Sequence, residues 1–245
     1  MDMRLEGAMN TLNIQGIKKG YDSKVVLRDI SFTFEQGKIY ALLGRNGAGK
    51  TTLFNCLAQE VKAEAGRAEL IVSNHLKNLM PSDIGYVFST AILPDFLTGY
   101  EFIRFFMDVN KEKIKEEYTI GDYFDMVKMV EEDRHKLIKG YSHGMKNKLQ
   151  MMMFIIAKPP VILLDEPLTS LDVVVALEMK QLLRKMAKDH IIIFSTHILQ
   201  LATDLCDEIV ILNDGVLEQL DHSLLKDPHF EEKLIKILSE DGANG

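Results

Sequence analysis

The chain has 245 residues, of which 47% are hydrophobic, enough for one large α/β domain with a buried core. Its formal net charge of −7 disfavours a general nucleic-acid binder, because such proteins present a basic surface to the phosphate backbone. No stretch reaches the roughly 20 consecutive apolar residues of a membrane-spanning helix, and residues 1–10 lack the apolar block of a secretory signal, so we expect a cytoplasmic protein.

The first part of the chain predicts antiparallel strands followed by a buried strand. Residues 11–34 alternate apolar and polar side chains on both sides of a turn at Tyr21-Asp22-Ser23. The continuous apolar run over residues 39–43 then predicts a strand that is buried on both faces. After it we expect a helix over about residues 50–59 and strands over residues 69–72 and 84–88.

The later part predicts helices and then a parallel sheet. Apolar residues at helical spacing predict helices over residues 99–109 and 121–130. From residue 161 onward, apolar strands alternate with amphipathic helices, which is typical of a parallel sheet with crossover helices. The predicted strands cover residues 161–164, 191–194 and 209–212, and the predicted helices cover residues 174–188, 198–205 and 227–239.

A glycine-rich loop between the strand over residues 39–43 and the following helix carries the first functional motif. Residues 44–51 read Gly-Arg-Asn-Gly-Ala-Gly-Lys-Thr and fit the G-x-x-x-x-G-K-[ST] phosphate-binding pattern in its required strand–loop–helix context. Glycines let successive N–H groups turn toward one phosphate, and the helix start adds partial positive charge. The predicted nucleotide contacts are Gly44, Asn46, Gly47, Ala48, Gly49, Lys50, Thr51 and Thr52. Lys50 would hold the β- and γ-phosphates, Thr51 a Mg²⁺ ion and Thr52 the α-phosphate.

An acidic pair follows the predicted strand over residues 161–164. Asp165 and Glu166 emerge at the carboxyl end of that strand, where open α/β sheets place their ligands. We expect Asp165 to hold Mg²⁺ and Glu166 to polarise the water that attacks the γ-phosphate. Together with the phosphate loop, the pair predicts a nucleotide hydrolase.

A third motif, Tyr-Ser-His-Gly-Met over residues 141–145, precedes a predicted helix. It resembles the Leu-Ser-Gly-Gly-Gln signature of ABC transporter ATP-binding subunits, with Ser142 and Gly144 in agreement and the other three residues departing. The resemblance implies that Ser142 and Gly144, at a helix N-terminus, contact the γ-phosphate of ATP held by a second subunit. Read alone, Ser142 is simply a helix N-cap.

The resemblance covers nearly everything from about residue 11 to residue 221. It implies an α/β fold: a P-loop NTPase parallel-sheet core with an antiparallel β subdomain and an inserted helical subdomain. We expect the nucleotide-binding domain over residues 1–225, its helical subdomain at about residues 90–157, and a C-terminal helix and tail over residues 226–245.

Three further positions match the same family pattern. Tyr21 matches the aromatic residue that stacks on adenine, with an ordinary turn tyrosine as the alternative. Asp172 matches an aspartate at the interface between the two subunits. His197 matches the switch histidine that contacts the γ-phosphate and positions the water with Glu166. The resemblance thus makes Glu166, His197 and Lys50 the catalytic set.

One position departs from the pattern. Ser89 stands where the family usually carries a glutamine that approaches Mg²⁺ and the attacking water. Serine is too short to span the same distance, so we expect slowed turnover, unless a bridging water or Thr90 closes the gap. The predicted metal-site positions are Thr51, Asp165 and Ser89.

Two clusters keep open roles at this stage. Phe102, Phe105 and Phe106 lie at near-helical spacing and indicate either core packing or a groove for a permease helix. A basic patch around the signature would serve phosphates of a second subunit, a permease loop or merely solvent, and consists of Lys136, Lys139, Lys146 and Lys148.

The resemblance implies ATP and Mg²⁺ as cofactors and two protein partners, a separate transmembrane permease and a second nucleotide-binding subunit of the same or a homologous chain. The protein would lie on the inner face of the cell membrane, held there by the permease. Two alternatives stay open. One is a soluble ABC-type ATPase acting on nucleic acid or the ribosome, which the acidic composition disfavours. The other is a regulatory subunit that binds ATP and leaves hydrolysis to a partner, which Ser89 and the altered signature keep open.

Overall fold

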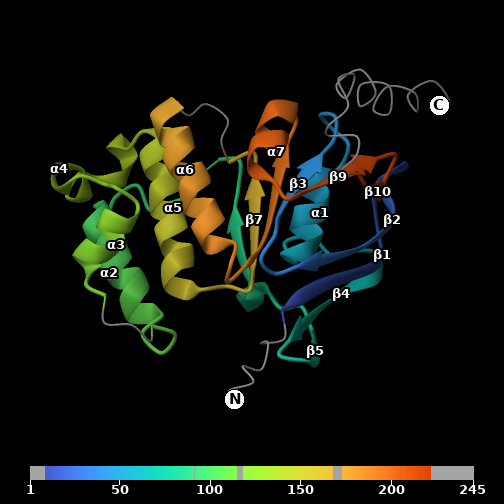
Figure 1. Ribbon diagram of the computed structural model, residues 1–245, viewed down its shortest axis with the longest axis horizontal. Coiled ribbons are helices and arrows are strands. Elements are labelled where there is room, and N and C mark those ends of the chain that lie inside the picture. Colours follow the sequence, from blue (N-terminus) through green and yellow to red (C-terminus); the bar gives the residue numbers. More distant parts are fainter. Residues whose placement is uncertain (1–8, 91, 115–117, 168–172, 222–245) are drawn as a thin grey trace, which may run out of the picture.

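In a computed structural model of the protein, the residues described are 9–90, 92–114, 118–167 and 173–221. An antiparallel sheet, a mainly parallel sheet and a group of helices lie side by side across the molecule (Figure 1). The predicted α/β class, with an antiparallel sheet and a helical segment, is therefore confirmed. The helix predicted over residues 227–239 lies outside the described residues.

The antiparallel sheet follows the alternating pattern of residues 11–34. Its order is β2-β1-β4-β5, and its strands are β1 (Thr11–Tyr21), β2 (Lys24–Glu35), β4 (Ala65–Val72) and β5 (His75–Asn78). Strands β1 and β2 form a hairpin whose turn contains Asp22 at a φ of 53°. The side chains of Leu12 and Ile14 point into the core, as the alternation predicts, and Ile17 is buried after a shift of register between Ile14 and Ile17.

The second sheet has the order β10-β9-β3-β8-β7-β6 and is parallel except for β10. Its strands are β3 (Ile39–Leu43), β6 (Ile84–Val87), β7 (Val161–Asp165), β8 (Ile191–Thr196), β9 (Glu208–Asn213) and β10 (Val216–Gln219). Every residue of β3, β7 and β8 is buried, which explains their unbroken apolar runs. Because the carboxyl ends of parallel strands share one edge, the loops after β3, β7 and β8 meet there.

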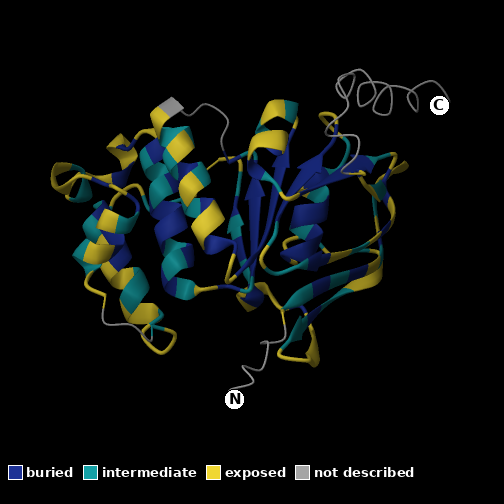
Figure 2. Ribbon diagram, in the orientation of Figure 1, coloured by how far each residue is buried: buried dark blue, intermediate teal, exposed yellow. Residues whose placement is uncertain are grey.

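Helices cover both faces of this sheet. Helix α1 (Lys50–Leu57) packs between the two sheets, while α5 (His143–Ala157), α6 (Val173–Met186) and α7 (Leu199–Leu205) pack on the opposite face. Figure 2 shows the central strands buried between these layers. Within the described residues, no helix has the length and apolar character needed to cross a bilayer.

Two of the remaining helices pack on α5 around a third core that includes Phe102, Phe124 and Met152, and a single-turn helix packs beside them. These helices are α2 (Gly99–Val109), α3 (Ile120–Met126) and α4 (Glu131–Arg134). Short 3₁₀ turns also precede β6, at Pro81–Asp83, and α5, at Ile138–Gly140. Capping boxes start α2 and α3, since Thr98 and Thr119 each accept a backbone N–H three residues later. The helix predicted over residues 121–130 corresponds to α3, which already ends at Met126, and α4 is a separate single turn.

Candidate nucleotide-binding site

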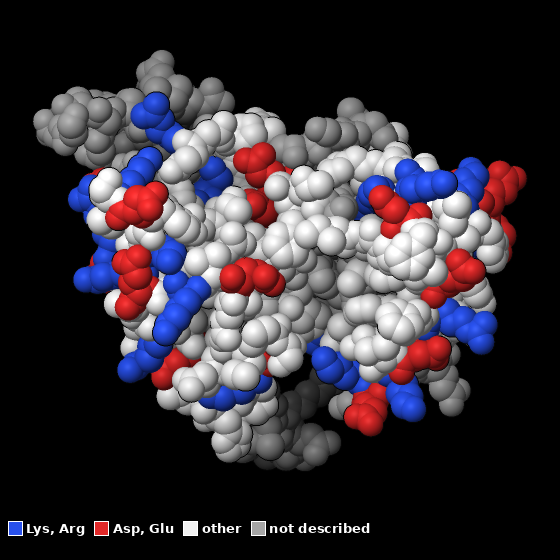
Figure 3. Space-filling view, turned by 180° about the vertical axis from the view of Figure 1, so that it is seen from behind, with Lys and Arg blue, Asp and Glu red and all other residues white. Residues whose placement is uncertain are grey.

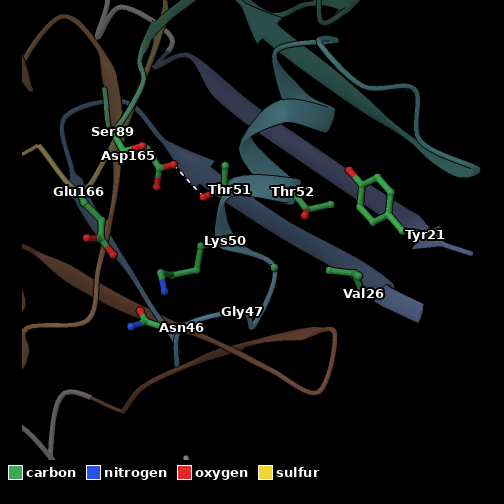
Figure 4. A pocket seen from close by; sticks show the side chains of 11 residues that line it. Tyr21, Val26, Asn46, Gly47, Lys50, Thr51, Thr52, Ser89, Asp165 and Glu166 are labelled. Carbon is green, nitrogen blue, oxygen red and sulfur yellow. Dashed lines mark hydrogen bonds between the residues drawn. The ribbon is translucent and has the colours of Figure 1, made fainter. Parts of the chain in front are cut away.

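A cavity of about 390 Å³ lies at the edge of the parallel sheet where the loops after β3 and β7 meet. Every residue that lines it, except Val26, is a residue that the sequence predicts for the site. Figure 4 shows Tyr21 and Val26 at one end and Glu166 at the other, with the phosphate loop between them. The predicted residues in the lining are Tyr21, Asn46, Gly47, Gly49, Lys50, Thr51, Thr52, Ser89, Asp165 and Glu166.

The phosphate loop needs its glycines for two separate reasons. Gly47 and Gly49 have φ values of 81° and 106°, a region that side chains rarely adopt. A Cβ at Gly44 would lie 2.8 Å from the carbonyl oxygen of Leu212, so the loop can run close to β9 only without a side chain there. The loop is therefore shaped by close packing as well as by backbone conformation.

Lys50 lies folded over this loop. Its Nζ donates to the carbonyl oxygens of Gly44 at 2.8 Å and Arg45 at 3.2 Å, and the residue is buried. Burial lowers the pKa of Lys50 below that of an exposed lysine, while the negative charges of Glu166 and Asp165 act in the opposite direction. The ammonium is thus held by weak neutral acceptors, which an anionic phosphate would outcompete.

Asp165 links three elements of the site. One carboxylate oxygen accepts a hydrogen bond from the Thr51 hydroxyl at 2.8 Å, which Figure 4 marks, and the other accepts from the Ser195 hydroxyl at 2.5 Å. The carboxylate is almost fully buried and is thereby fixed beside the phosphate loop. Carboxylate and hydroxyl oxygens are ligands that Mg²⁺ prefers, and this ion usually takes only one or two of them from the protein. The pair Thr51 and Asp165 therefore fits a magnesium ion that also binds phosphate oxygens.

Glu166 and His197 form the second pair. The imidazole Nδ1 of His197 and a carboxylate oxygen of Glu166 are 3.0 Å apart, which joins the ends of β7 and β8. The backbone of Glu166 is left-handed, with a φ of 51°, and its N–H donates to the Ser195 hydroxyl at 3.1 Å. Such a conformation is costly for a residue with a Cβ and persists only where its surroundings hold it. An acid and an imidazole so joined can orient a water and accept its proton.

The signature residues lie elsewhere in the chain. Ser142 is the N-cap of α5, and its hydroxyl accepts from the N–H of Met145 at 3.2 Å. Ser142 is exposed and Gly144 is buried, and neither belongs to the lining of the cavity. Gly44 and Ala48 are in the phosphate loop but also outside the lining, and Asp172 lies outside the described residues. The contacts expected between these residues and ATP stay predictions.

Two polar residues at the site were missed. Ser195 pairs with Asp165 across the parallel register of β7 and β8, and Asn147 of α5 donates from Nδ2 to the carbonyl oxygen of Pro167 at 2.9 Å. A signal existed for Ser195, because it is a polar residue directly after the apolar run over residues 191–194. No local signal marks Asn147, whose partner depends on how α5 packs.

The predicted basic patch is largely neutralised by acidic neighbours. Its paired members are Lys136 with Asp133 at 2.7 Å, Lys146 with Asp95 at 3.4 Å and Lys148 with Glu178 at 2.7 Å. On the face shown in Figure 3, basic and acidic side chains are likewise interspersed at the two sides, and the middle of this face is mostly uncharged. This arrangement does not resemble the continuous basic surface that a nucleic acid requires.

The aromatic cluster of α2 is divided between core and surface. Phe102 is 8% exposed and Phe106 is half-buried, so both contribute to the third core, whereas Phe105 is 61% exposed. Core packing is therefore the role of Phe102 and Phe106.

Several known proteins are similar to this chain in sequence. The family model described as ABC transporter matches residues 27–169. The chain is 33% identical over 207 residues to the uncharacterized ABC transporter ATP-binding protein YxlF of Bacillus subtilis, covering 83% of this chain and 68% of the relative. It is 31% identical over 227 residues to the sulfate/thiosulfate import ATP-binding protein CysA of Bacillus cereus, covering 86% of this chain and 61% of the relative.

Two solved structures share the fold. An ATP-binding subunit of an ABC transporter has a TM-score of 0.75 at 23% identity, with 92% of this chain and 98% of that chain covered. The dimeric ATP-binding cassette MJ0796, bound to ADP and Pi after hydrolysis, has a TM-score of 0.70 at 22% identity, with 86% of this chain and 99% of that chain covered.

Proposed function

This chain belongs to the ABC transporter family as an ATP-binding, ATP-hydrolysing member, and from this premise we propose that it dimerises on ATP to drive a separate membrane permease. The observation that carries the proposal is the meeting of two pairs at one sheet edge. Asp165 is bonded to Thr51 of the phosphate loop, and Glu166 is bonded to His197. A phosphate-binding loop, a metal-binding carboxylate and a base with its orienting partner are the parts that phosphoryl transfer to water requires.

ATP would bind along the cavity with its triphosphate on the loop. The backbone N–H groups of residues 46–51 would surround the phosphates, and Lys50 would exchange its carbonyl partners for the β- and γ-phosphates. Tyr21, at the far end of the cavity, is 45% exposed and thus has ring surface available for stacking on adenine. Val26 would add an apolar contact to the base or the ribose.

Hydrolysis would use the second pair. Glu166 would accept a proton from the attacking water while His197 holds the carboxylate in place and contacts the γ-phosphate. Thr51 and Asp165 would hold a magnesium ion, which when bound neutralises charge on the β- and γ-phosphates. Ser195 would keep both acidic residues in register, because its single hydroxyl contacts Asp165 and the backbone of Glu166.

The second subunit would complete the site. Ser142 and Gly144 sit at the start of a 15-residue helix but do not line the cavity of their own chain. A helix N-terminus attracts anions, so a second copy or a homologue could present it to the γ-phosphate of this chain. The bound nucleotide would then connect the two chains and close the dimer.

The permease would dock on the segment that follows Ser89. Ile92 and Phe96 in this segment are 75% and 79% exposed, and exposed apolar side chains that form one patch mark the kind of surface that a protein partner covers. Phe105, on the adjacent helix α2, adds further exposed apolar surface. Docking there would place the protein in the cytoplasm, on the inner face of the membrane, and would connect the permease to the cavity through Ser89.

Two measurements test this proposal. ATP hydrolysis by the parent should fall at least about 100-fold in Glu166→Gln, because the amide cannot accept the proton from water. A pull-down from gently solubilised membranes should recover one multi-spanning protein with the parent and lose it with Phe96→Glu. Recovery of ribosomes or nucleic acid in place of a membrane protein would contradict the permease proposal.

A regulatory subunit that only binds ATP is the second candidate, and Ser89 is the observation that favours it. Ser89 lines the cavity at the position where the family places its glutamine. The side chain there is therefore too short to reach the attacking water as a glutamine would. The same rate comparison decides between the two functions. If the parent is as inert as Glu166→Gln both alone and with its membrane partner, the regulatory function is correct.

A further inference from the structure

The short segment that carries the catalytic acid is held from two sides. On one side, Ser195 of β8 accepts the N–H of Glu166 at 3.1 Å. On the other side, Asn147 of α5 donates to the carbonyl oxygen of Pro167 at 2.9 Å, with both groups buried. The left-handed Glu166 therefore lies between two polar anchors that come from different elements.

The second anchor lies on the signature helix itself. Asn147 is 3% exposed and follows the N-cap Ser142 by little more than one helical turn. A helix is stiff over such a distance, so a shift of the Ser142 end moves Asn147 with it. The other end of α5 is packed on the sheet, where Phe154 leaves no space for a Cβ at Gly85. That end is therefore closely packed, and a movement of the Ser142 end would act on Pro167 through Asn147.

We propose that Asn147 is a positioning residue that conveys the capping of the partner's nucleotide by Ser142 to the catalytic Glu166 of its own chain. The inference rests on the proposed function, because it requires that Ser142 contact ATP in a second subunit. The route is a single chain of contacts from the Ser142 N-cap, through the first turns of α5 and Asn147, to the carbonyl of Pro167 next to Glu166. Each nucleotide would thereby influence the hydrolysis of the other.

The chemistry of the anchor makes the inference specific. A carbonyl oxygen needs a donor, and the amide of asparagine supplies one where the isosteric carboxylate of aspartate would repel it. Gln150 offers a matched control on the same face of α5, three residues further along. It is 5% exposed, and its Oε1 has no hydrogen-bond partner among the described residues. Replacing it alters the same buried helix face without removing an anchor of the catalytic segment.

The test compares Asn147→Asp, Asn147→Leu and Gln150→Met with the parent under steady-state ATP hydrolysis. Both Asn147 variants should lose on the order of 10- to 100-fold in kcat with little change in KM for ATP, since they displace the base and not the binding loop. Gln150→Met should keep the parental kcat. Combined with Glu166→Gln, the Asn147 variants should still form the dimer on magnesium and ATP, because the phosphate loop and Ser142 are untouched.

A pH profile separates positioning from a general loss of structure. A buried aspartate facing a carbonyl has a raised pKa, and its protonated form is again a donor, so kcat of Asn147→Asp relative to the parent should rise as the pH falls from 8 to 6. Equal kcat losses in Asn147→Asp and Gln150→Met, or unchanged kcat in both Asn147 variants, would overturn the inference. If Asn147→Leu does not fold, a flat pH profile of Asn147→Asp overturns it. A parent that neither hydrolyses ATP nor dimerises as Glu166→Gln would instead refute the proposed function and, with it, this inference.

Discussion

Ser195 places one hydroxyl group between the two acidic residues of the site. The hydroxyl donates to Asp165 at 2.5 Å and accepts the backbone N–H of Glu166 at 3.1 Å, and the side chain is fully buried. A buried donor and acceptor left without a partner are more costly than the bond itself is stabilising. The position of both carboxylates therefore depends on a residue that touches neither nucleotide nor water in the proposed mechanism.

Replacement of Ser195 by alanine should affect stability and catalysis together. We expect a loss of about 1–3 kcal/mol in the free energy of unfolding, from the two unpaired groups. We also expect a loss on the order of 10-fold or more in kcat, as is typical when a group that orients a metal ligand is removed. Tyr86→Phe is the control, because it removes a hydroxyl bond from Tyr86 of β6 to Asn55 of α1, and neither residue lines the cavity. A Ser195→Ala enzyme with parental kcat would contradict this account of Asp165 and Glu166.

Ser89 should limit the rate of hydrolysis. It lines the cavity and is exposed, so there is room for the longer side chain that the family usually carries. With the membrane partner bound, Ser89→Gln should raise kcat by about 10-fold, the equivalent of one hydrogen bond made in the transition state. Ser89→Ala serves as the comparison. Three indistinguishable rates would show that this position has no influence on turnover.

His190 should make stability depend on pH. It is 5% exposed, and its Nδ1 donates to the carbonyl oxygen of Pro159 at 2.6 Å. Burial lowers the pKa of His190 below its usual value, so the folded state resists protonation while the unfolded chain takes up a proton near pH 6.5. Stability is therefore lost as the pH falls through 6.5 toward the lower folded pKa, by up to about 1.4 kcal/mol per pH unit.

The matched variant is His190→Asn, which keeps a donor for Pro159 but does not titrate. Urea unfolding at pH 7.5 and pH 5.5 should show a smaller acid loss for this variant than for the parent. An equal loss in both proteins would assign the acid sensitivity to other groups.

At the scale of elements, the strands that face the core from both sides were the most predictable. Strands β3, β7 and β8 are buried throughout, and each contains an unbroken apolar run of four or five residues. Strand β5 was missed, because all four of its residues are exposed and carry no alternation. Strand β10 was missed for a similar reason, since it is a short edge strand without a buried residue. The local sequence pattern reports which residues of a strand are buried. Strands without buried residues, such as β5 and β10, are fixed by pairing with a neighbouring strand, which no local pattern reports.

Part of the site followed the same rule. The phosphate loop, the acidic pair and His197 each follow a buried strand, and the shared edge of a parallel sheet then brings them together. The contacts that anchor them could not be read in this way. The bond from Asn147 to Pro167 joins residues 20 positions apart through the packing of α5 on the sheet, and no local pattern reports it.

The packing of α5 on β6 should tolerate no added volume at Gly85. A Cβ there would lie 2.6 Å from Phe154 and 2.9 Å from Pro159, closer than carbon atoms can approach. Gly85→Ala should therefore lower the free energy of unfolding by about 1–3 kcal/mol, as overpacked core positions do. Gly140→Ala is the control, because nothing lies within 4 Å of its added Cβ. Equal denaturation midpoints for the two variants would mean that α5 shifts freely on the sheet.

At the scale of the whole molecule, the proposed nucleotide contacts fall into two separate groups. The phosphate loop and the acidic residues share one cavity on the parallel sheet, whereas Ser142 and Gly144 start a helix that does not reach it. In the proposed complex, a single chain would therefore contact the triphosphate from one side only. We propose that a second copy or a homologue supplies the other side, so that ATP completes an interface as well as a substrate site.

The most direct test measures the mass of the Glu166→Gln protein by sedimentation velocity, with the partner chains present where the native complex is a heterodimer. Saturating magnesium and ATP should convert the monomer into a dimer, while ADP should not, because only ATP carries the γ-phosphate that Ser142 would contact. Adding Ser142→Glu should abolish the dimer, since a carboxylate at the helix start repels the phosphate. A monomer at saturating ATP, or a dimer that Ser142→Glu leaves intact, would contradict the account.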